Sequence, residues 1–226
     1  MTSNTGRMNS EIALKKYDHD LGYGPKTWAW PSADEKLFSI FDMVKEIDEW
    51  IDLCKGFDVA VQAGGAVGVW PLRLSRTFDI VHTFEAHPEN YQCLIKNCVK
   101  DNVCAYHAAL SDRKRKVKIY NLPHQTNNFG AGYIVDADDG VDTVLIDELG
   151  LKTCDLICLD IEGAELEALK GAEQTIAEFR PLVVLEDKQM PQLSHFKREV
   201  GAPGEWLKQF GYKLAKTVHW DSVYSC

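Results

Sequence analysis

The sequence predicts a Rossmann-like α/β fold, in which helices flank a mostly parallel central sheet. Three observations support this prediction. Apolar runs of strand length alternate with segments of helical periodicity after about residue 56. Three glycines lie in the turn after the first of these runs, and acidic residues end the second, fourth and fifth runs. Such alternation is typical of βαβ units, whose strands lie parallel.

The composition is that of one soluble globular domain. The chain has 226 residues and a net charge of −9, which opposes general binding to a phosphate backbone. No apolar run approaches the roughly 18 residues that a membrane span needs. Seven cysteines without zinc-site spacing predict reduced, mostly buried thiols. With no signal-like N-terminal segment, we expect a cytoplasmic protein without membrane or nucleic-acid partners; the sequence does not indicate an oligomeric state.

We expect an N-terminal arm and covering helix over residues 1–55 and the main domain over residues 56–226. Residues 1–20 are polar and of mixed charge, which predicts a frayed arm. Trp28 and Trp30 lie beside prolines and precede an amphipathic segment, which predicts a cover over one end of the sheet. The two tryptophans either pack in the core or contact a ligand, and packing is the default interpretation.

The elements of the main domain follow in order. Strands are expected at residues 57–62, 79–86, 103–110, 154–162 and 181–187, and helices at residues 69–78, 88–98 and 164–179. A short helix and two closing strands, the last antiparallel, are expected after Gly201. Residues 111–140 depart from this alternation, because a basic strand-like stretch precedes a turn-rich one. An insertion of this length in a compact domain is more often functional than structural.

The glycine turn predicts a ligand site at the carboxyl edge of the sheet. Gly64, Gly65 and Gly68 allow the backbone to approach a ligand closely between a strand and a helix N-terminus. Glu85 ends the second strand about 20 residues further on, where an acid accepts hydrogen bonds from ribose hydroxyls in such folds. Together these features predict a nucleotide-like ligand, either a nicotinamide cofactor or S-adenosylmethionine.

The nicotinamide alternative predicts a catalytic pair such as Tyr-x-x-x-Lys on a helix. That spacing occurs at Tyr212 and Lys216, but in a strand-like stretch that follows a glycine near the C-terminus. A chance match is the better interpretation.

Four segments then point to one family: "QAGGAVG" from Gln62, "FEAHP" from Phe84, "ALSD" from Ala109 and "LDIEGAELEALKGA" from Leu159. They are similar to the Asp-Val-Gly-Ala-Asn-Val-Gly loop, the Phe-Glu-Pro-x-Pro strand end, the adenine-side turn and the most distinctive segment of the FkbM-type methyltransferases. The chain resembles this S-adenosylmethionine-dependent, class I family over about residues 57–186. It departs from the family pattern at Gln62, usually Asp, and at Ala66, usually Asn.

The resemblance implies S-adenosylmethionine as cofactor and S-adenosylhomocysteine as product. Gln62 offers a neutral hydrogen-bond acceptor for the methionine amino group in place of a carboxylate. The residues expected to contact the cofactor are Gln62, Ala63, Gly64, Gly65, Gly68, Glu85, Ala86, His87, Ala109, Leu110, Ser111 and Asp160.

Asp160 and Glu162 are the candidate catalytic residues, because they end the fourth strand just before a helix. An in-line methyl transfer needs mainly proximity and a nucleophile that loses its proton. The structural alternatives are a helix N-cap for Asp160 and dipole pairing in the first turn for Glu162. His87 and His107 are further candidate bases. The residues expected to contact the acceptor are Asn127, Asn128, Phe129 and Glu186.

No resident metal is expected. Asp160, Glu186 and Asp187 offer oxygen ligands for Mg²⁺, but solvated carboxylates at strand ends are common. "DADDG", from Asp136, lacks the spacing of a calcium loop, and "RKRK", from Arg113, is expected to be a solvated sheet edge and not a phosphate site.

The predicted function is transfer of a methyl group from S-adenosylmethionine to a hydroxyl of a sugar or other small polar acceptor. One alternative is a binding or regulatory protein that keeps the cofactor pocket without turnover. The other is a nucleotide or nucleic-acid methyltransferase.

Overall fold

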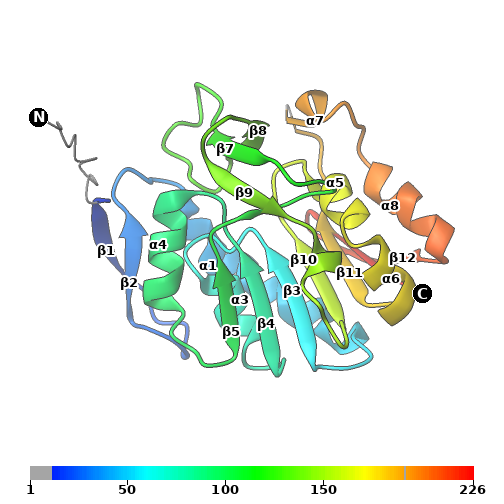
Figure 1. Cartoon of the computed structure of the whole chain (residues 1–226). Coiled ribbons are helices and arrows are strands. Elements are labelled where there is room, and N and C mark those ends of the chain that lie inside the picture. The colour runs from blue at the N-terminus through cyan, green and yellow to red at the C-terminus, as the bar shows by residue number, and fades with distance from the viewer. Residues whose placement is uncertain (1–11, 191) are drawn as a thin grey trace, which may run out of the picture.

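The computed structural model describes residues 12–190 and 192–226, and confirms the predicted fold class. Its central sheet has seven strands in the order β12-β13-β11-β10-β3-β4-β5 (Figure 1). Five strands run parallel: β3 (Val59–Ala63), β4 (Ile80–Phe84), β5 (Val103–Tyr106), β10 (Leu156–Leu159) and β11 (Leu182–Glu186). Strand β13 (Asp221–Ser225) is antiparallel both to β11 and to β12 (Lys213–Val218), so the expected antiparallel strand near the C-terminus is confirmed.

Helices cover both faces of this sheet, because alternate residues of each buried strand point to opposite sides. Ala60 and Leu156 belong to one core cluster, together with residues 37–54 and α3 (Val69–Leu74). Val61 and Ile157 belong to the other, which packs on α5 (Glu165–Lys170), α6 (Glu173–Phe179) and α8 (Ala202–Leu207). The described chain also has the helices α4 (Pro88–Asn97) and α7 (Gln192–His195) and the 3-10 turn η5 (Lys208–Phe210). No helix among the described residues is long and apolar enough to cross a bilayer.

The N-terminal segment shares the core of the main sheet. Strands β1 (Leu14–Asp18) and β2 (Thr27–Pro31) form an antiparallel hairpin beside α4 (Figure 1), so a frayed arm is wrong for this stretch; residues 1–11 lie outside the described part. Trp28 and Trp30 are buried around Phe41, as the packing interpretation predicts. The covering helix is a chain of short α and 3-10 turns: η1 (Leu37–Ser39), α1 (Ile40–Met43), η2 (Val44–Glu46), α2 (Ile47–Trp50) and η3 (Ile51–Leu53).

A second, four-stranded sheet accounts for the insertion. It has the order β6-β9-β7-β8, formed by β6 (Ala109–Leu110), β9 (Val141–Val144), β7 (Lys116–Tyr120) and β8 (Tyr133–Asp136). The single strand expected at residues 103–110 is therefore wrong, because the chain leaves the main sheet after Tyr106 and joins this one. The basic stretch is paired with acids: Arg115, for example, binds Asp136 and Glu167. The sheet edge expected here is wrong, because Lys116 begins β7, which lies between β9 and β8. Each of the four basic residues from Arg113 to Lys116 pairs with an acid.

The helix expected at residues 164–179 is broken at Gly171. A Cβ at this glycine would lie 2.0 Å from the backbone oxygen of Ser111, so the chain passes too close to the second sheet for a side chain. The carboxylate of Asp147, in the 3-10 turn η4 (Ile146–Glu148), accepts hydrogen bonds from the backbone N–H groups of Gln174 and Thr175. This side chain caps α6, and the helix starts anew there.

Candidate functional site

A cavity of about 220 Å³ lies at the carboxyl ends of β3, β4, β10 and β11. The covering segment and the loop before β8 form part of its wall. Leu37, Ile40 and Met43 line it from the N-terminal side, and Asn128 and Phe129 from the loop. The sequence elements that were expected to converge on one sheet edge therefore do so.

The glycine turn between β3 and α3 is held by the protein's own chain. Gly64 has φ +84°, and a Cβ there would lie 2.0 Å from the backbone oxygen of Asp160. Gly68 has φ +98° at the N-cap of α3. Gly64 and Ala66 line the cavity, whereas Gly65 and Gly68 are not among its lining residues. The sequence suggested that a ligand requires glycine at this turn. At Gly64 the requirement comes instead from the close approach of the chain at the end of β10.

Glu85 marks one end of the cavity. Its Oε2 accepts a hydrogen bond from the backbone N–H of Ala66, and its Oε1 accepts one from that of His87, both at 2.6 Å. Burial raises the pKa of Glu85 to about 7, against the lowering effect of these backbone donors. The carboxyl group is therefore fixed in position and sits near the balance between its neutral and charged forms at neutral pH.

His87 and Phe129 form an aromatic wall on the same side. The His87 ring caps α4 by accepting a hydrogen bond from the N–H of Glu89, and lies 4.6 Å from the Phe129 ring, centroid to centroid. Burial lowers the pKa of His87 to about 4, so the ring is neutral at physiological pH. Asn90 donates to the backbone oxygen of Phe129 and Asp34 accepts from its N–H, which fixes the loop.

Gln62 braces the turn. Its amide nitrogen donates to the backbone oxygens of Ala63 and Gly64, and its amide oxygen accepts from the Thr83 hydroxyl at 2.5 Å. The side chain lines the cavity, yet all three hydrogen bonds are internal. The amide oxygen, which was expected to accept from the methionine amino group, accepts from Thr83 here. A direct contact between Gln62 and that amino group stays a prediction.

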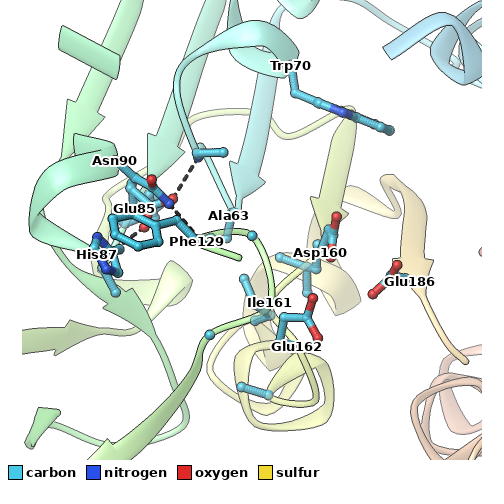
Figure 2. A pocket seen from close by; sticks show the side chains of 18 of the residues that line it. Ala63, Trp70, Glu85, His87, Asn90, Phe129, Asp160, Ile161, Glu162 and Glu186 are labelled. Carbon is cyan, nitrogen blue, oxygen red and sulfur yellow. Dashed lines mark hydrogen bonds between the residues drawn. The ribbon is translucent and has the colours of Figure 1, made fainter. Parts of the chain in front are cut away.

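A cluster of carboxyl groups marks the other end. Asp160, Glu162 and Glu186 each place a carboxylate oxygen within 4.8 Å of the others, and Figure 2 shows the three groups facing one another. Lys188 pairs with Glu186 at 2.5 Å, and Asp221 lines the cavity opposite Glu186 in the β11–β13 register. The two candidate catalytic residues are thus together, with Glu186 beside them.

Burial and mutual repulsion favour the neutral forms of these acids. Burial, followed by the nearby Glu186 and Glu162 carboxylates, raises the pKa of Asp160 well above its usual range. Burial and Glu186 raise the pKa of Glu162 to about 8. The pKa of Asp221 rises to about 7, chiefly through burial and then through Glu46. A carboxylate in this cluster is a stronger base than one in water.

The loop after β10 is held by a buried ion network. Arg198 pairs with Glu165 and Asp187, and donates from Nε to the backbone oxygen of Gly163. Glu165 in turn accepts from the N–H groups of Ile161 and Gly163. Asp187 is consumed by this network and by the N–H of Gly201, so the metal-ligand set that included Asp187 is wrong.

Neither structural alternative for the catalytic pair describes their position. Helix α5 begins at Glu165 and has Ala164 as N-cap residue, without a side-chain hydrogen bond, so Asp160 is no helix cap. Glu162 has φ +53°, a left-handed conformation that costs about 1–2 kcal/mol for a residue with a Cβ. Its carboxylate accepts a hydrogen bond from Gln192 and lines the cavity.

The remaining expected residues divide into two groups. Ala63, Ala86, Ala109 and Leu110 line the cavity, and Phe129 lies beside Glu85, away from Asp160 (Figure 2). Three of these expected residues do not line it. Asn127 and His107 are exposed, with His107 stacked on Tyr91, and Ser111 is buried. Phe129 therefore stands on the Glu85 side, not on the acceptor side to which the sequence assigned it.

Several residues that line the cavity were not predicted from the sequence. Trp70 lines the cavity from α3, whereas Trp28 and Trp30, for which the sequence left ligand contact open as an alternative to packing, do not. Lys188 follows β11, and Asp221 begins β13, which pairs with β11 from far along the chain. Only the strand register brings Asp221 to the cluster, so no local pattern points to it. Tyr212 and Lys216 do not form the catalytic pair of a nicotinamide site, because the buried Tyr212 hydroxyl donates a hydrogen bond to the backbone oxygen of Pro181.

The order of the seven strands, with a cavity at their carboxyl ends between a strand-end acid and a carboxylate cluster, is that of class I methyltransferases. The chain belongs to the FkbM methyltransferase family, because the model of the methyltransferase FkbM domain matches residues 63–214. No curated protein matches the sequence.

Two solved structures superpose with TM-scores of 0.50 and 0.51 and so agree in fold. A methyltransferase FkbM of Methylobacillus flagellatus KT superposes with a TM-score of 0.50 at 18% identity, over 75% of this chain and 44% of that one. A candidate caffeoyl-CoA O-methyltransferase of Staphylococcus aureus gives 0.51 at 15% identity, over 83% and 88%. The tRNA (uracil-54, C5)-methyltransferase of Pyrococcus abyssi, solved with S-adenosyl-L-homocysteine, gives 0.46 at 12% identity, over 94% and 42%. This chain thus spans under half of the Methylobacillus protein.

Proposed function

We propose that the protein transfers a methyl group from S-adenosylmethionine to a hydroxyl oxygen of a sugar or another small polar acceptor. Family membership supports the methyl transfer. The observation that carries the rest is the two-ended cavity, with Glu85 at one end and the cluster of Asp160, Glu162 and Glu186 at the other.

The Glu85 end fits the adenosine part of the cofactor. Two backbone N–H groups hold the carboxyl group, and its remaining lone pairs are free to accept ribose hydroxyls. Ala86, Leu110 and Phe129 provide apolar surface of the kind that suits a flat base. When bound, S-adenosylmethionine supplies a methyl group that its sulfonium already activates.

The carboxyl end fits an acceptor with hydroxyl groups. Carboxylates accept hydrogen bonds from hydroxyls and so orient them. In its ionised form Asp160 is a stronger base than an ordinary aspartate, because its pKa is raised, and it takes the hydroxyl proton as the oxygen attacks. The ionised acids also repel phosphate, so the cluster favours a neutral acceptor over a nucleic acid.

A screen with isotope-labelled S-adenosylmethionine tests this proposal. Sugars, glycosides and other polyols are offered as acceptors to the wild-type protein and to Asp160→Asn, an isosteric variant that removes the charge. Label in a hydroxyl-bearing acceptor with the wild type, and its loss in the variant, supports O-methylation. Tight binding of S-adenosylhomocysteine without transfer to any acceptor would favour the non-catalytic binding protein instead.

A further inference from the structure

We propose that the carboxylate cluster of Asp160, Glu162 and Glu186 is a binding site for a hard divalent cation such as Mg²⁺, Mn²⁺ or Ca²⁺. The sequence predicted no resident metal, because solvated carboxylates at strand ends are common, and the ligand set that it considered included Asp187, which pairs with Arg198. In the structure Glu162, and not Asp187, is the third member of the cluster. Carboxylate oxygens from two strand ends and one loop lie within 4.8 Å of one another.

The spacing of the oxygens fits such an ion. One carboxylate oxygen from each of the three residues lies within 4.8 Å of the others. Oxygens bound to one Ca²⁺ at about 2.4 Å are at most about 4.8 Å apart, and those bound to one Mg²⁺ at about 2.1 Å at most about 4.2 Å. Three oxygens evenly spaced 4.8 Å apart lie about 2.8 Å from their common centre, so Ca²⁺ needs a contraction of a few tenths of an ångström and Mg²⁺ or Mn²⁺ a larger one, which side-chain rotation supplies.

Two buried oxygen atoms beside the cluster need a partner. Oε2 of Glu186 and Oδ2 of Asp221 are buried and have no hydrogen-bond partner among the described residues. The two residues are 2% and 8% exposed, and both line the cavity. An unpaired buried carboxylate oxygen costs free energy that a cation or a water bound to it would recover. Asp221 is not one of the three ligands, so its unpaired oxygen is an observation independent of the cluster.

The charge balance also favours a cation. The charged side chains that act on Asp160 are three carboxyl groups, Glu162, Glu186 and Asp221, and one ammonium group, Lys188. Lys188 occupies Oε1 of Glu186 and leaves Oε2 open. One ammonium group does not balance four acids, so a divalent ion would favour their ionised forms, which burial and mutual repulsion otherwise disfavour.

The site would act on the acceptor, an inference that rests on the proposed function. A cation held by carboxylates keeps open coordination positions, to which a hydroxyl oxygen binds. Binding to the cation lowers the pKa of that hydroxyl and fixes its position. A polyol with adjacent hydroxyls, which offers two such oxygens, is the acceptor chemistry that the site favours.

Cation binding is tested without any acceptor. The full-length protein is stripped with a chelator and titrated with Mn²⁺, followed by paramagnetic resonance of the free ion, and with Mg²⁺ and Ca²⁺ by calorimetry. We expect one saturable site, with affinity at least tenfold weaker in Glu162→Gln and in Glu186→Gln, which are isosteric. Asp138→Asn, in the exposed acidic turn after β8, is the matched control and should bind as the wild type does.

Three results would overturn the proposal: no saturable binding of any of the three ions at about 1 mM, unchanged affinity in both glutamine variants, or loss of binding in Asp138→Asn. Circular dichroism and thermal melting verify that each variant is folded, and the use of two ligand variants protects the test if one is not. Titration with S-adenosylhomocysteine on the same samples separates this result from the proposed function, because cation binding does not require the cofactor.

Discussion

Replacement of Glu85 by glutamine probes the cofactor end of the cavity through stability first. Burial raises the pKa of Glu85 from 4.5 to about 7. The folded protein therefore binds more protons than the unfolded chain between these pH values, and the free energy of unfolding falls as pH rises through them. A shift from 4.5 to 7 is about 2.5 units, which corresponds to about 3 kcal/mol. Glu85→Gln removes this pH dependence, so its stability relative to the wild type should rise by up to that amount from pH 4.5 to 7.5. At every pH the variant also loses one of the two backbone hydrogen bonds, because its amide has a single acceptor oxygen.

The same change should weaken the cofactor. An ionised Glu85 accepts both ribose hydroxyls, whereas the glutamine amide presents one donor group where an acceptor is needed. We expect S-adenosylhomocysteine to bind Glu85→Gln more weakly by about 1.5–3 kcal/mol, which is roughly 10- to 150-fold at pH 8. Because binding favours the charged form, wild-type affinity should rise from pH 6 to pH 8, and the variant should lose that dependence.

Urea unfolding at several pH values measures the first effect, and calorimetry in buffers of different ionisation enthalpy measures the second together with proton release. Glu173→Gln, at an exposed position in the first turn of α6, is the matched control and should follow the wild type in both. Equal cofactor affinity in Glu85→Gln and wild type, with the same pH dependence, would refute the assignment of Glu85 to the ribose.

Three further changes test other parts of the account. Gly64→Ala places a Cβ 2.0 Å from a backbone oxygen and should destabilise by at least about 2 kcal/mol more than Gly22→Ala, whose Cβ meets nothing within 4 Å; equal losses in urea unfolding would mean that this approach is not constrained. Arg198→Met strands two buried carboxylates and should cost about 3–5 kcal/mol in the same assay, and a loss under 1 kcal/mol would contradict the network. Asp160→Asn should melt at or above the wild-type temperature, because it removes a buried carboxyl whose pKa is raised, and should bind S-adenosylhomocysteine within a few-fold, while methyl transfer falls about 10²-fold; full activity would move the base to another residue.

The sequence predicted most of the parallel strands and helices in their order along the chain, because buried strands and amphipathic helices have local periodicity. It failed where pairing or packing between distant segments decides. The hairpin of β1 and β2 is polar outside and held by Asn97 of α4, which no local pattern shows. The break at Gly171 depends on the approach of Ser111, and the end of β5 at Tyr106 depends on a second sheet.

The candidate site follows the same division. Strand-end residues such as Glu85 and Asp160 were predictable, because parallel strands deliver their carboxyl ends to one edge. Asp221 was not, since an antiparallel strand near the C-terminus brings it in by register alone. The role of Asp187 was misjudged because its partner Arg198 lies in a later loop. Neighbouring strand-end acids look alike in sequence, and only their partners separate a cavity residue from a structural one.

A structure of the complex with S-adenosylhomocysteine would show whether this cavity holds the cofactor. We expect the ligand at the carboxyl ends of β3, β4 and β10, with its ribose hydroxyls on Glu85 and its sulfur end directed toward Asp160. A ligand bound outside this cavity, or one whose ribose lies at the carboxylate cluster and not at Glu85, would contradict it.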